Sequence, residues 1–288
     1  MTPNDNDLYY NYHGDGVVGP INVLTREEAA NCVARVEAWM DFFAGKPMGD
    51  ERFKPHLHLP FVNHIVRHPA LVKAVQQVLG TDNILCWSSD FNTKESNSQG
   101  IYSPHQDATY TGLEPPERCL TAWVALSDPV GEREGCLKFF KSSHEGGQVP
   151  HVEETSTTDN LLSRGQFIEN PPHEKPLPIQ LRGGQATLHH FHMIHQSGHN
   201  LSDSNRIGLA VRYMAASVKQ TGKIRESVTL ISGQHEHDGF DLEPILPSFP
   251  SKEDVRRGKE AHADAMRREA ANYFEGTSTA SAYDELLA

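Results

Sequence analysis

The sequence predicts a mainly β protein with flanking helices, in which short antiparallel strands form a sandwich or barrel. Short apolar runs bounded by Gly, Pro and Asn turns fill the region 83–231, and helical stripes of apolar residues lie on either side of it. A chain of 288 residues is long enough for one such domain. We therefore expect a single domain over 1–288, with a helical support region over 1–82, a β core over 83–231, and a loop and helix over 232–288.

The N-terminal support region contains one predicted strand and two predicted helices. Residues 16–23 have the pattern of a short strand interrupted by a Gly-Pro pair. Thr25 and Glu28 have the spacing of a capping box at the start of a helix over 26–43. A second amphipathic helix over 69–79 is followed by a glycine, a common helix terminator. The apolar stripes of both helices are expected to face the core.

The β core shows apolar residues alternating with polar ones, which is the period of a half-buried strand. The predicted strands cover residues 84–92, 119–126, 135–140, 177–181, 185–189, 207–214 and 227–231. Residues 146–178 are polar and are predicted to form a strandless loop, whose length favours a lid or binding loop. A charged helix is predicted over 252–274.

The overall composition narrows the class of partner. A net charge of −12 argues against nucleic acid or an anionic membrane surface as the main partner. Four scattered cysteines form no CxxC pair, which argues against a zinc ribbon or a thioredoxin-type site. The N-terminus lacks the apolar core of a secretory signal, and no apolar run has the length of a membrane span. We expect a cytoplasmic protein that acts on a small molecule.

Seventeen histidines raise the chance of accidental metal-like pairs, so the competing motifs must be separated. The triplet H-x-D occurs at 13–15, 105–107 and 262–264. The last lies in the predicted C-terminal helix, where positions i and i+2 point apart, and is expected to be solvated surface. The first lies in an early turn with no histidine cluster on a neighbouring element. Surface or supporting roles are expected for the H-x-H pairs at 56–58 and 235–237.

The middle triplet is the strongest candidate for a metal site. It lies at a strand edge, and in an extended segment His105 and Asp107 face the same way while Gln106 points elsewhere. Two histidines and one carboxylate on an octahedral ion leave three positions open, an arrangement typical of non-haem iron(II) oxygenases. Spacing alone does not choose the third ligand among the five histidines downstream: His189, His190, His192, His195 and His199.

Several spaced motifs occur together in this chain. They are His105-Gln106-Asp107; Trp123; Gly135-Cys136-Leu137-Lys138-Phe139 with Ser142-Ser143-His144; and His195-Gln196-Ser197-Gly198-His199-Asn200-Leu201-Ser202 with Arg206. Over roughly residues 16–214, the combination resembles the phytanoyl-CoA dioxygenase family, in its small-metabolite hydroxylase branch. The resemblance implies a double-stranded β-helix, that is, a cupin-like jelly roll. The family usually has H-G-S at 195–197 and G-P-N at 198–200, and these departures leave the ligand histidine intact.

The resemblance also implies roles for individual residues. It makes His105, Asp107 and His195 the iron ligands. It places Arg206 against the distal carboxylate of the cosubstrate 2-oxoglutarate, which a planar guanidinium binds with two hydrogen bonds. Ser197 matches a position that hydrogen-bonds the same carboxylate. Other positions near the cosubstrate are Trp123, Gln106 and Asn92, although Trp123 is equally consistent with a core tryptophan and Asn92 with an ordinary strand residue.

The implied reaction is hydroxylation of an aliphatic C–H bond with iron(II), 2-oxoglutarate and dioxygen, releasing succinate and carbon dioxide. Because Asp107 is present, chlorination is disfavoured: related halogenases have a small residue at this position. The implied substrate is a small polar metabolite, such as an organophosphonate, quaternary amine, amino acid or natural-product intermediate. The candidate substrate residues are Tyr110, Thr109, Tyr102, His189 and Arg182.

Two other classes of function remain open at this point. A non-iron, metal-dependent jelly-roll hydrolase would use the same triad without needing Arg206, and a non-catalytic binding module would need neither. The histidines His189, His190 and His192 either line the pocket or are satisfied by nearby backbone carbonyl groups. The sequence makes no prediction of oligomeric state.

Overall fold

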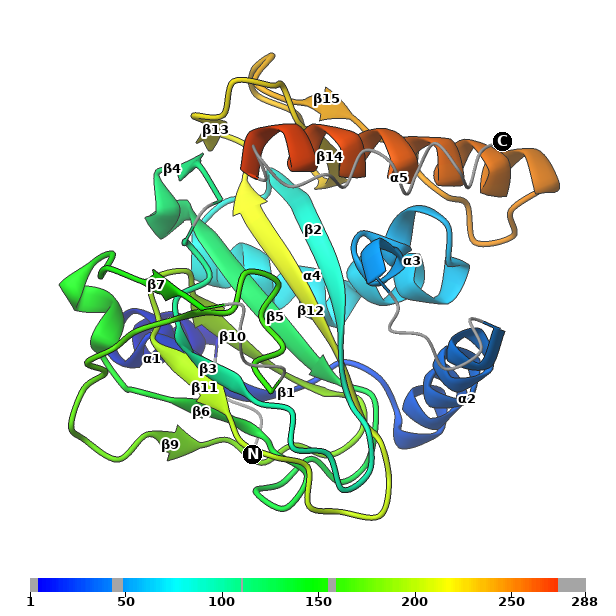
Figure 1. Ribbon diagram of the computed structural model, residues 1–288. Helices are drawn as coiled ribbons and strands as arrows, with labels where there is room; N and C mark the ends of the chain where they lie inside the picture. The colour runs from blue at the N-terminus through cyan, green and yellow to red at the C-terminus, as the bar shows by residue number, and fades with distance from the viewer. Residues whose placement is uncertain (1–4, 43–48, 110, 155–158, 274–288) are drawn as a thin grey trace.

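A computed structural model describes residues 5–42, 49–109, 111–154 and 159–273. Two antiparallel sheets face each other as in a jelly roll, with helices on the outer side of the larger sheet and across one of its ends (Figure 1). The predicted mainly β architecture with flanking helices is confirmed.

The larger sheet has seven strands and forms one wall of the space between the two sheets. In spatial order they are β1 (Val17–Asn22), β10 (Gln185–His190), β5 (Cys119–Ala125), β12 (Arg206–Ala215), β2 (Ile84–Lys94), β14 (Ser227–Ser232) and β15 (Asp241–Leu242). All neighbours are antiparallel except β14 and β15. The edge strands β1 and β15 lie outside the range 83–231 predicted for the β core.

The smaller sheet has four strands and faces the larger one (Figure 1). In spatial order they are β3 (Tyr102–His105), β11 (His195–Ser197), β6 (Leu137–Phe139) and β9 (Leu177–Pro178). Two short ribbons accompany the sheets, β4 (Leu113–Glu114) with β13 (Lys219–Gln220) and β7 (Val152–Glu153) with β8 (Gln166–Phe167). The prediction of a strandless segment over 146–178 was therefore wrong: two-residue strands are too short to show a sequence period.

Five α-helices lie within the described residues, together with four short 3-10 helices. The α-helices are α1 (Asp5–Asp15), α2 (Arg26–Phe42), α3 (Pro60–Val66), α4 (Pro69–Leu79) and α5 (Lys252–Tyr273). The 3-10 helices are η1 (Gly49–Arg52), η2 (Pro55–Leu57), η3 (Pro116–Arg118) and η4 (Ser143–Gly146). In these parts of the chain, no helix combines the length and apolar character needed to cross a bilayer.

The helices predicted from apolar stripes over 26–43 and 69–79 correspond to α2 and α4, and the charged helix predicted over 252–274 corresponds to α5. The capping box of α2 forms, because the Thr25 amide donates to the Glu28 carboxylate at 2.8 Å and the Glu28 amide donates to the Thr25 hydroxyl at 3.2 Å. The helix α1 was not predicted, because its polar sequence has no continuous stripe. Its buried residues Leu8 and Tyr12 join the core shared by the helices and the larger sheet.

The period of two divides each central strand between two environments. On β5, Leu120, Ala122 and Val124 pack in the core under the helices, whereas Trp123 and Ala125 face the smaller sheet. On β12, Ile207, Leu209 and Val211 face the helices in the same way. Alternate residues of β12, including Arg206, Ala210 and Arg212, therefore face the space between the sheets, where a pocket lies.

His262, which was expected at the surface, is buried, and so are His56 and His58, for which surface or supporting roles were expected. His56 and His58 lie in and just after η2, and His262 lies on α5, which packs over that segment. The His262 ring nitrogen Nε2 donates to the carbonyl of Phe53 at 3.0 Å. Helix periodicity was sufficient to place His262 on a helix, but it could not show that the η2 segment covers this face.

Candidate metal centre

Three side chains from two strands and a turn meet between the sheets. His105 ends β3, Asp107 follows in the adjoining turn, and His195 begins β11. Their ligand atoms all lie within 4.8 Å of one another. Within the described ranges, no other group of three histidine, cysteine or acidic side chains comes this close. The pairing of β3 with β11 sets His195 directly opposite His105.

Both imidazoles are oriented by the backbone. Nδ1 of His105 donates to the carbonyl of Ser103 at 2.7 Å, and Nδ1 of His195 donates to the carbonyl of Met193 at 3.0 Å. These bonds fix the tautomer and leave each Nε2 lone pair free for a metal.

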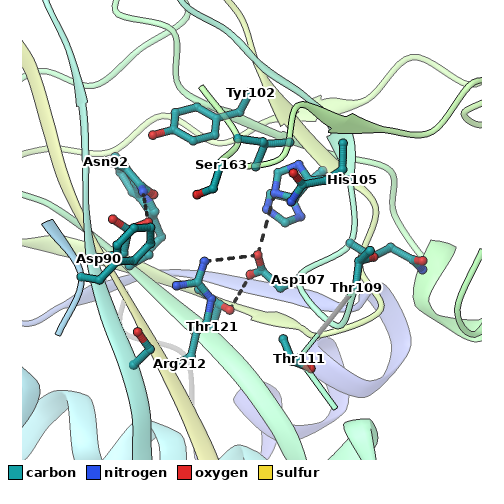
Figure 2. A pocket seen from close by; sticks show the side chains of 18 of the residues that line it. Asp90, Asn92, Tyr102, His105, Asp107, Thr109, Thr111, Thr121, Ser163 and Arg212 are labelled. Carbon is teal, nitrogen blue, oxygen red and sulfur yellow. Dashed lines mark hydrogen bonds and ion pairs between the residues drawn. The ribbon is translucent and has the colours of Figure 1, made fainter. Parts of the chain in front are cut away.

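The carboxylate of Asp107 is held by one of its two oxygens. Its Oδ2 accepts a hydrogen bond of 2.5 Å from the Thr121 hydroxyl and one of 3.2 Å from Nε2 of His189. Its Oδ1 lies 3.8 Å from Nε2 of His105 and 3.7 Å from the guanidinium of Arg212 (Figure 2). Thr121 and His189 therefore leave Oδ1 as the oxygen that faces the histidine ligands.

The charge states of the three groups suit a divalent metal. Burial lowers the pKa of His105 to about 4 and holds the pKa of His195 well below its ordinary value. Burial opposes ionisation of Asp107, but Arg212 and the hydrogen bond from His189 prevail and hold the pKa of the carboxyl well below its ordinary value. Two neutral imidazoles and a carboxylate on one side of a site are a donor set that fits iron(II) with open positions.

Arg206 lies in the same pocket and is almost completely buried. Its Nη1 donates to the carbonyl of Gly135 at 3.1 Å and its Nη2 to the carbonyl of Asn92 at 3.2 Å. Its Nε has no hydrogen-bond partner, and no carboxylate of the described residues pairs with it. Burial lowers the pKa of Arg206 to about 10, so the guanidinium is still charged at neutral pH.

Aromatic rings enclose this guanidinium. Its carbon lies 5.3 Å from the ring centroid of Trp123 and 5.8 Å from that of Tyr102. The indole nitrogen of Trp123 donates to Oδ1 of Asn92 at 3.1 Å, so both residues keep a fixed orientation at the pocket wall. Gly208 makes this packing possible, because a Cβ built there would lie 2.0 Å from the Trp123 ring.

Lys94 is a buried amine that was not predicted from the sequence. Its Nζ donates to the hydroxyl of Ser197 at 2.7 Å and to the backbone carbonyls of Ser197 and Gly198. Burial lowers the pKa of Lys94 to about 6, and nearby Arg206 adds to the effect. The sequence could have indicated it, because Lys94 and Asn92 are two residues apart on β2 and share a face.

The rest of the pocket is lined mostly by polar groups. From the larger sheet come Arg212, Asp90 and Thr121, and Glu269 enters from helix α5. The remaining lining side chains include hydroxyl, amide and guanidinium groups: Ser88, Thr109, Thr111, Ser163, Gln166, Arg52 and Arg164. Burial raises the pKa of Asp90, and the neighbouring Arg52 and Arg212 oppose that rise.

The other residues predicted from the sequence to belong to the site differ in whether they line the pocket. Gln106 lines the pocket, but its amide donates to the carbonyls of Gly147 and His192 and accepts from the Val149 amide, so it fastens a loop. Thr109 and Tyr102 line the pocket, whereas Arg182 is exposed and is not among its lining residues. Tyr110 lies outside the described residues.

Three of the four downstream histidines outside the triad, His189, His190 and His192, have different surroundings. His189 lines the pocket beside Asp107. Nδ1 of His190 accepts a 3.0 Å hydrogen bond from the His192 amide, and these two rings lie 5.5 Å apart. Neither His190 nor His192 lines the pocket, so of the three only His189 is placed to influence the triad.

Comparisons with known proteins agree with this geometry. The model of the family described as phytanoyl-CoA dioxygenase (PhyH) matches residues 12–208. Phytanoyl-CoA dioxygenase domain-containing protein 1 of Rattus norvegicus is 32% identical over 164 residues, which cover 56% of this chain and 55% of that protein. A probable alpha-ketoglutarate-dependent hypophosphite dioxygenase of Stutzerimonas stutzeri is 31% identical over 168 residues, 56% of each chain. This chain thus spans about half the length of the curated relatives it matches.

A solved structure is similar over a longer stretch. The structure described as the non-heme monooxygenase ThoJ in its apo form has a TM-score of 0.80 at 27% identity, covering 93% of this chain and 98% of that chain. The shared fold therefore extends beyond the residues that the family model matches. The predicted jelly roll is confirmed.

Proposed function

This chain belongs to the phytanoyl-CoA dioxygenase family, and we propose that it uses iron(II), 2-oxoglutarate and dioxygen to hydroxylate an aliphatic carbon of a small polar metabolite. One observation carries the proposal: the buried guanidinium of Arg206 has no anionic partner among the described residues and lines the same pocket as the His105, Asp107 and His195 triad. An unpaired buried cation is unfavourable, and a bound carboxylate would satisfy it with two hydrogen bonds.

Each residue near the triad has a definite task in this proposal. His105 and His195 present their Nε2 lone pairs because backbone carbonyls hold their other nitrogens. Thr121 and His189 hold one oxygen of Asp107 and leave the other for the metal. When bound, iron(II) with 2-oxoglutarate and dioxygen would supply the oxidation of the C–H bond, with release of succinate and carbon dioxide.

Arg206 and its aromatic neighbours would hold the cosubstrate. A planar guanidinium forms two parallel hydrogen bonds to a carboxylate, and these hydrogen bonds are stronger when water is excluded. Trp123 and Tyr102 exclude water around it, since both rings are almost fully buried. The carboxylate at 107 supports hydroxylation, because it occupies the coordination position that a halide would otherwise need.

The lining of the pocket supports a small polar substrate. Most of the residues that line the pocket carry hydroxyl, amide, imidazole or charged groups, and a long hydrocarbon would leave many of these groups without partners. The chain also has no basic run suited to the phosphates of coenzyme A. A small metabolite with several hydrogen-bonding groups fits this lining better than an acyl-CoA.

The first test is the binding of metal and cosubstrate. Iron(II) should bind the purified protein at one ion per chain, and 2-oxoglutarate should then bind anaerobically at one molecule per chain, as measured by calorimetry. With dioxygen and ascorbate present, succinate should be released slowly even without substrate. Absence of iron-dependent 2-oxoglutarate binding would contradict the proposal.

Two variants make the test specific to the triad. Asp107→Ala should lose iron(II) binding by about 100-fold or more, because it removes the only anionic ligand. The control His199→Gln changes an exposed histidine whose Nδ1 donates to the carbonyl of Gln99 at 2.7 Å. Its metal and cosubstrate binding should equal those of the unaltered protein.

A further inference from the structure

Helix α5 ends at the pocket, and one of its side chains enters the pocket wall. The inward face of α5 is formed by Gly258, His262, Ala265 and Met266, which are buried at helical spacing. Glu269 continues this face by another three residues and lines the pocket. Figure 1 shows α5 crossing the end of the larger sheet at which β12 terminates.

The helix is fixed on both sides of Glu269. Near its start, Gly258 packs so closely on η2 that a Cβ there would lie 1.9 Å from the carbonyl oxygen of Leu57. After Glu269, the Asn272 side chain donates to the carbonyl of Ile224 at 2.8 Å and to the Glu226 carboxylate at 3.0 Å. Glu269 therefore keeps its position at the pocket without contributing to the attachment of the helix.

The carboxylate of Glu269 is uncommitted. Among the residues that the structure describes, none forms an ion pair or hydrogen bond with it. The nearby cation Lys54 is already bound to Glu243 at 2.6 Å and to the carbonyl of Ser227 at 2.7 Å. Of the two pocket carboxylates outside the triad, Asp90 has the Arg52 guanidinium at 3.5 Å and accepts a 3.0 Å hydrogen bond from the Asn92 amide, so Glu269 is the one with fewer contacts.

Arg212 supplies a second uncommitted charge in the same pocket. Arg212 faces the pocket from β12, and its guanidinium donates no hydrogen bond to any described residue. Its one ionic neighbour is Oδ1 of Asp107 at 3.7 Å, which is beyond hydrogen-bond distance (Figure 2). A guanidinium in this position is available to a carboxylate or phosphonate of a ligand that lies beside the metal centre.

We propose that Glu269 and Arg212 are the two charged ends of the substrate subsite, and that the substrate is a small zwitterion. Its ammonium group would contact Glu269, and its anionic group would contact Arg212. This inference rests on the proposed function, since the subsite lies beside the metal centre. A purely anionic or purely cationic substrate would leave one of these two pocket charges without a partner.

The test uses matched probes whose two charges are removed one at a time. The probes are the twenty standard L-α-amino acids, β-alanine and γ-aminobutyrate, each compared with its N-acetyl and carboxamide derivative. Binding is measured anaerobically on the protein loaded with iron(II) and 2-oxoglutarate, by quenching of tryptophan fluorescence, because Trp87 and Trp123 line the pocket. At least one zwitterion should bind, and its N-acetyl derivative should bind about tenfold more weakly or worse.

Two variants assign the ammonium end. Glu269→Gln keeps the size of the side chain and should weaken binding of that zwitterion by about tenfold or more, while binding of its N-acetyl derivative stays unchanged. The control Glu260→Gln removes an exposed carboxylate of the same helix, one that pairs with Arg256. It should leave all affinities within about twofold.

A third variant assigns the anionic end. Arg212→Gln should remove the preference for the carboxylate over the carboxamide. The proposal is overturned if no zwitterion binds, if N-acetyl derivatives bind as tightly as the free amino compounds, or if Glu269→Gln has the affinities of the unaltered protein. The binding of 2-oxoglutarate, measured first in every variant, separates these outcomes from a failure of the proposed function, which would abolish it in the unaltered protein as well.

Discussion

The two arginines on the inner face of β12 lie at opposite ends of one pocket and in contrasting surroundings. Arg206 is almost fully buried, stacked between Trp123 and Tyr102, and donates to two backbone carbonyls. Arg212 has 18% of its side chain exposed and donates no hydrogen bond to the described residues. One strand thus carries a rigid cation and a more open one six residues apart on the same face.

Under the proposed function, the surroundings of Arg206 serve the reaction, and the surroundings of Arg212 serve the choice of substrate. The surroundings of Arg206 are closed, and its charge lacks an anionic partner among the described residues; the proposed function assigns that place to the cosubstrate carboxylate. The surroundings of Arg212 contain uncommitted charges from β12 and from helix α5. The family match over residues 12–208 includes Arg206 and ends before Arg212 and Glu269. The family model therefore includes the arginine that the proposed function assigns to the cosubstrate, and it does not reach the two residues proposed to bind the substrate.

The largest expected effect tests the closed surroundings of Arg206. Arg206→Ala should weaken 2-oxoglutarate binding by about 100-fold or more, since truncating one partner of a buried charge pair costs about 2–5 kcal/mol. Iron(II) binding should be retained, because Arg206 contacts none of the three ligands. Calorimetric titration of both ligands checks this.

Arg206→Lys serves as the matched control for that change. It keeps the positive charge and loses the planar fork, so the loss of affinity should be intermediate. If Arg206→Ala retained full catalytic activity, the protein would instead fit a metal-dependent hydrolase with the same triad.

The next effect tests how tightly the surroundings of Arg206 are packed. In Gly208→Ala the new Cβ would lie 2.0 Å from the Trp123 ring, so the ring must move away from Asn92. Overpacking of this kind lowers the free energy of unfolding by about 1–3 kcal/mol. Chemical denaturation measures the loss. In Gly198→Ala, where a Cβ meets nothing within 4 Å, stability should be unchanged; equal stability of the two variants would disprove the packing argument.

The smallest effect tests the surroundings of Arg212 and Glu269, through the pH dependence of the free energy of unfolding. Burial raises the pKa of Glu269 to about 7 from an ordinary value of 4.5; Glu226 and Asp90 reinforce the rise, and Lys54 and Arg212 oppose it. The folded state therefore binds the proton more tightly, and this contribution to stability is lost as pH rises through 7.

Glu269→Gln should consequently stabilise the protein at pH 8, by about 1–2 kcal/mol after allowance for partial exposure of the side chain. At pH 4 the two proteins should have equal free energies of unfolding, because both carry a neutral side chain at this position. Denaturant titrations at the two pH values measure the difference. Destabilisation of the variant at pH 8 would mean that Glu269 has a structural partner after all.

The candidate site was only partly accessible to sequence reasoning. The period of two along a strand was enough to put His105 and Asp107 on one side. It could not select His195 among five histidines, because that depends on the register between β3 and β11, which are far apart in the sequence. The family resemblance selected His195, and the structure gives the geometric reason. Lys94, Asp90 and Arg212 were missed, although the same parity rule relates them to Asn92 and Arg206.

By itself, the sequence determined the elements whose pattern is local: the amphipathic helices α2, α4 and α5, the long strands, and the pairing of an imidazole with a carboxylate at 105–107. Tertiary structure alone decided which residues from distant segments share the pocket. The clearest example is Glu269, which looks like one more charged residue on a charged helix. The packing of α5 on η2 and on the segment 224–226 places that carboxylate in the wall of the pocket that Arg212 and the triad also line. The sequence could not show this, because no local pattern encodes the surface against which a helix face is buried.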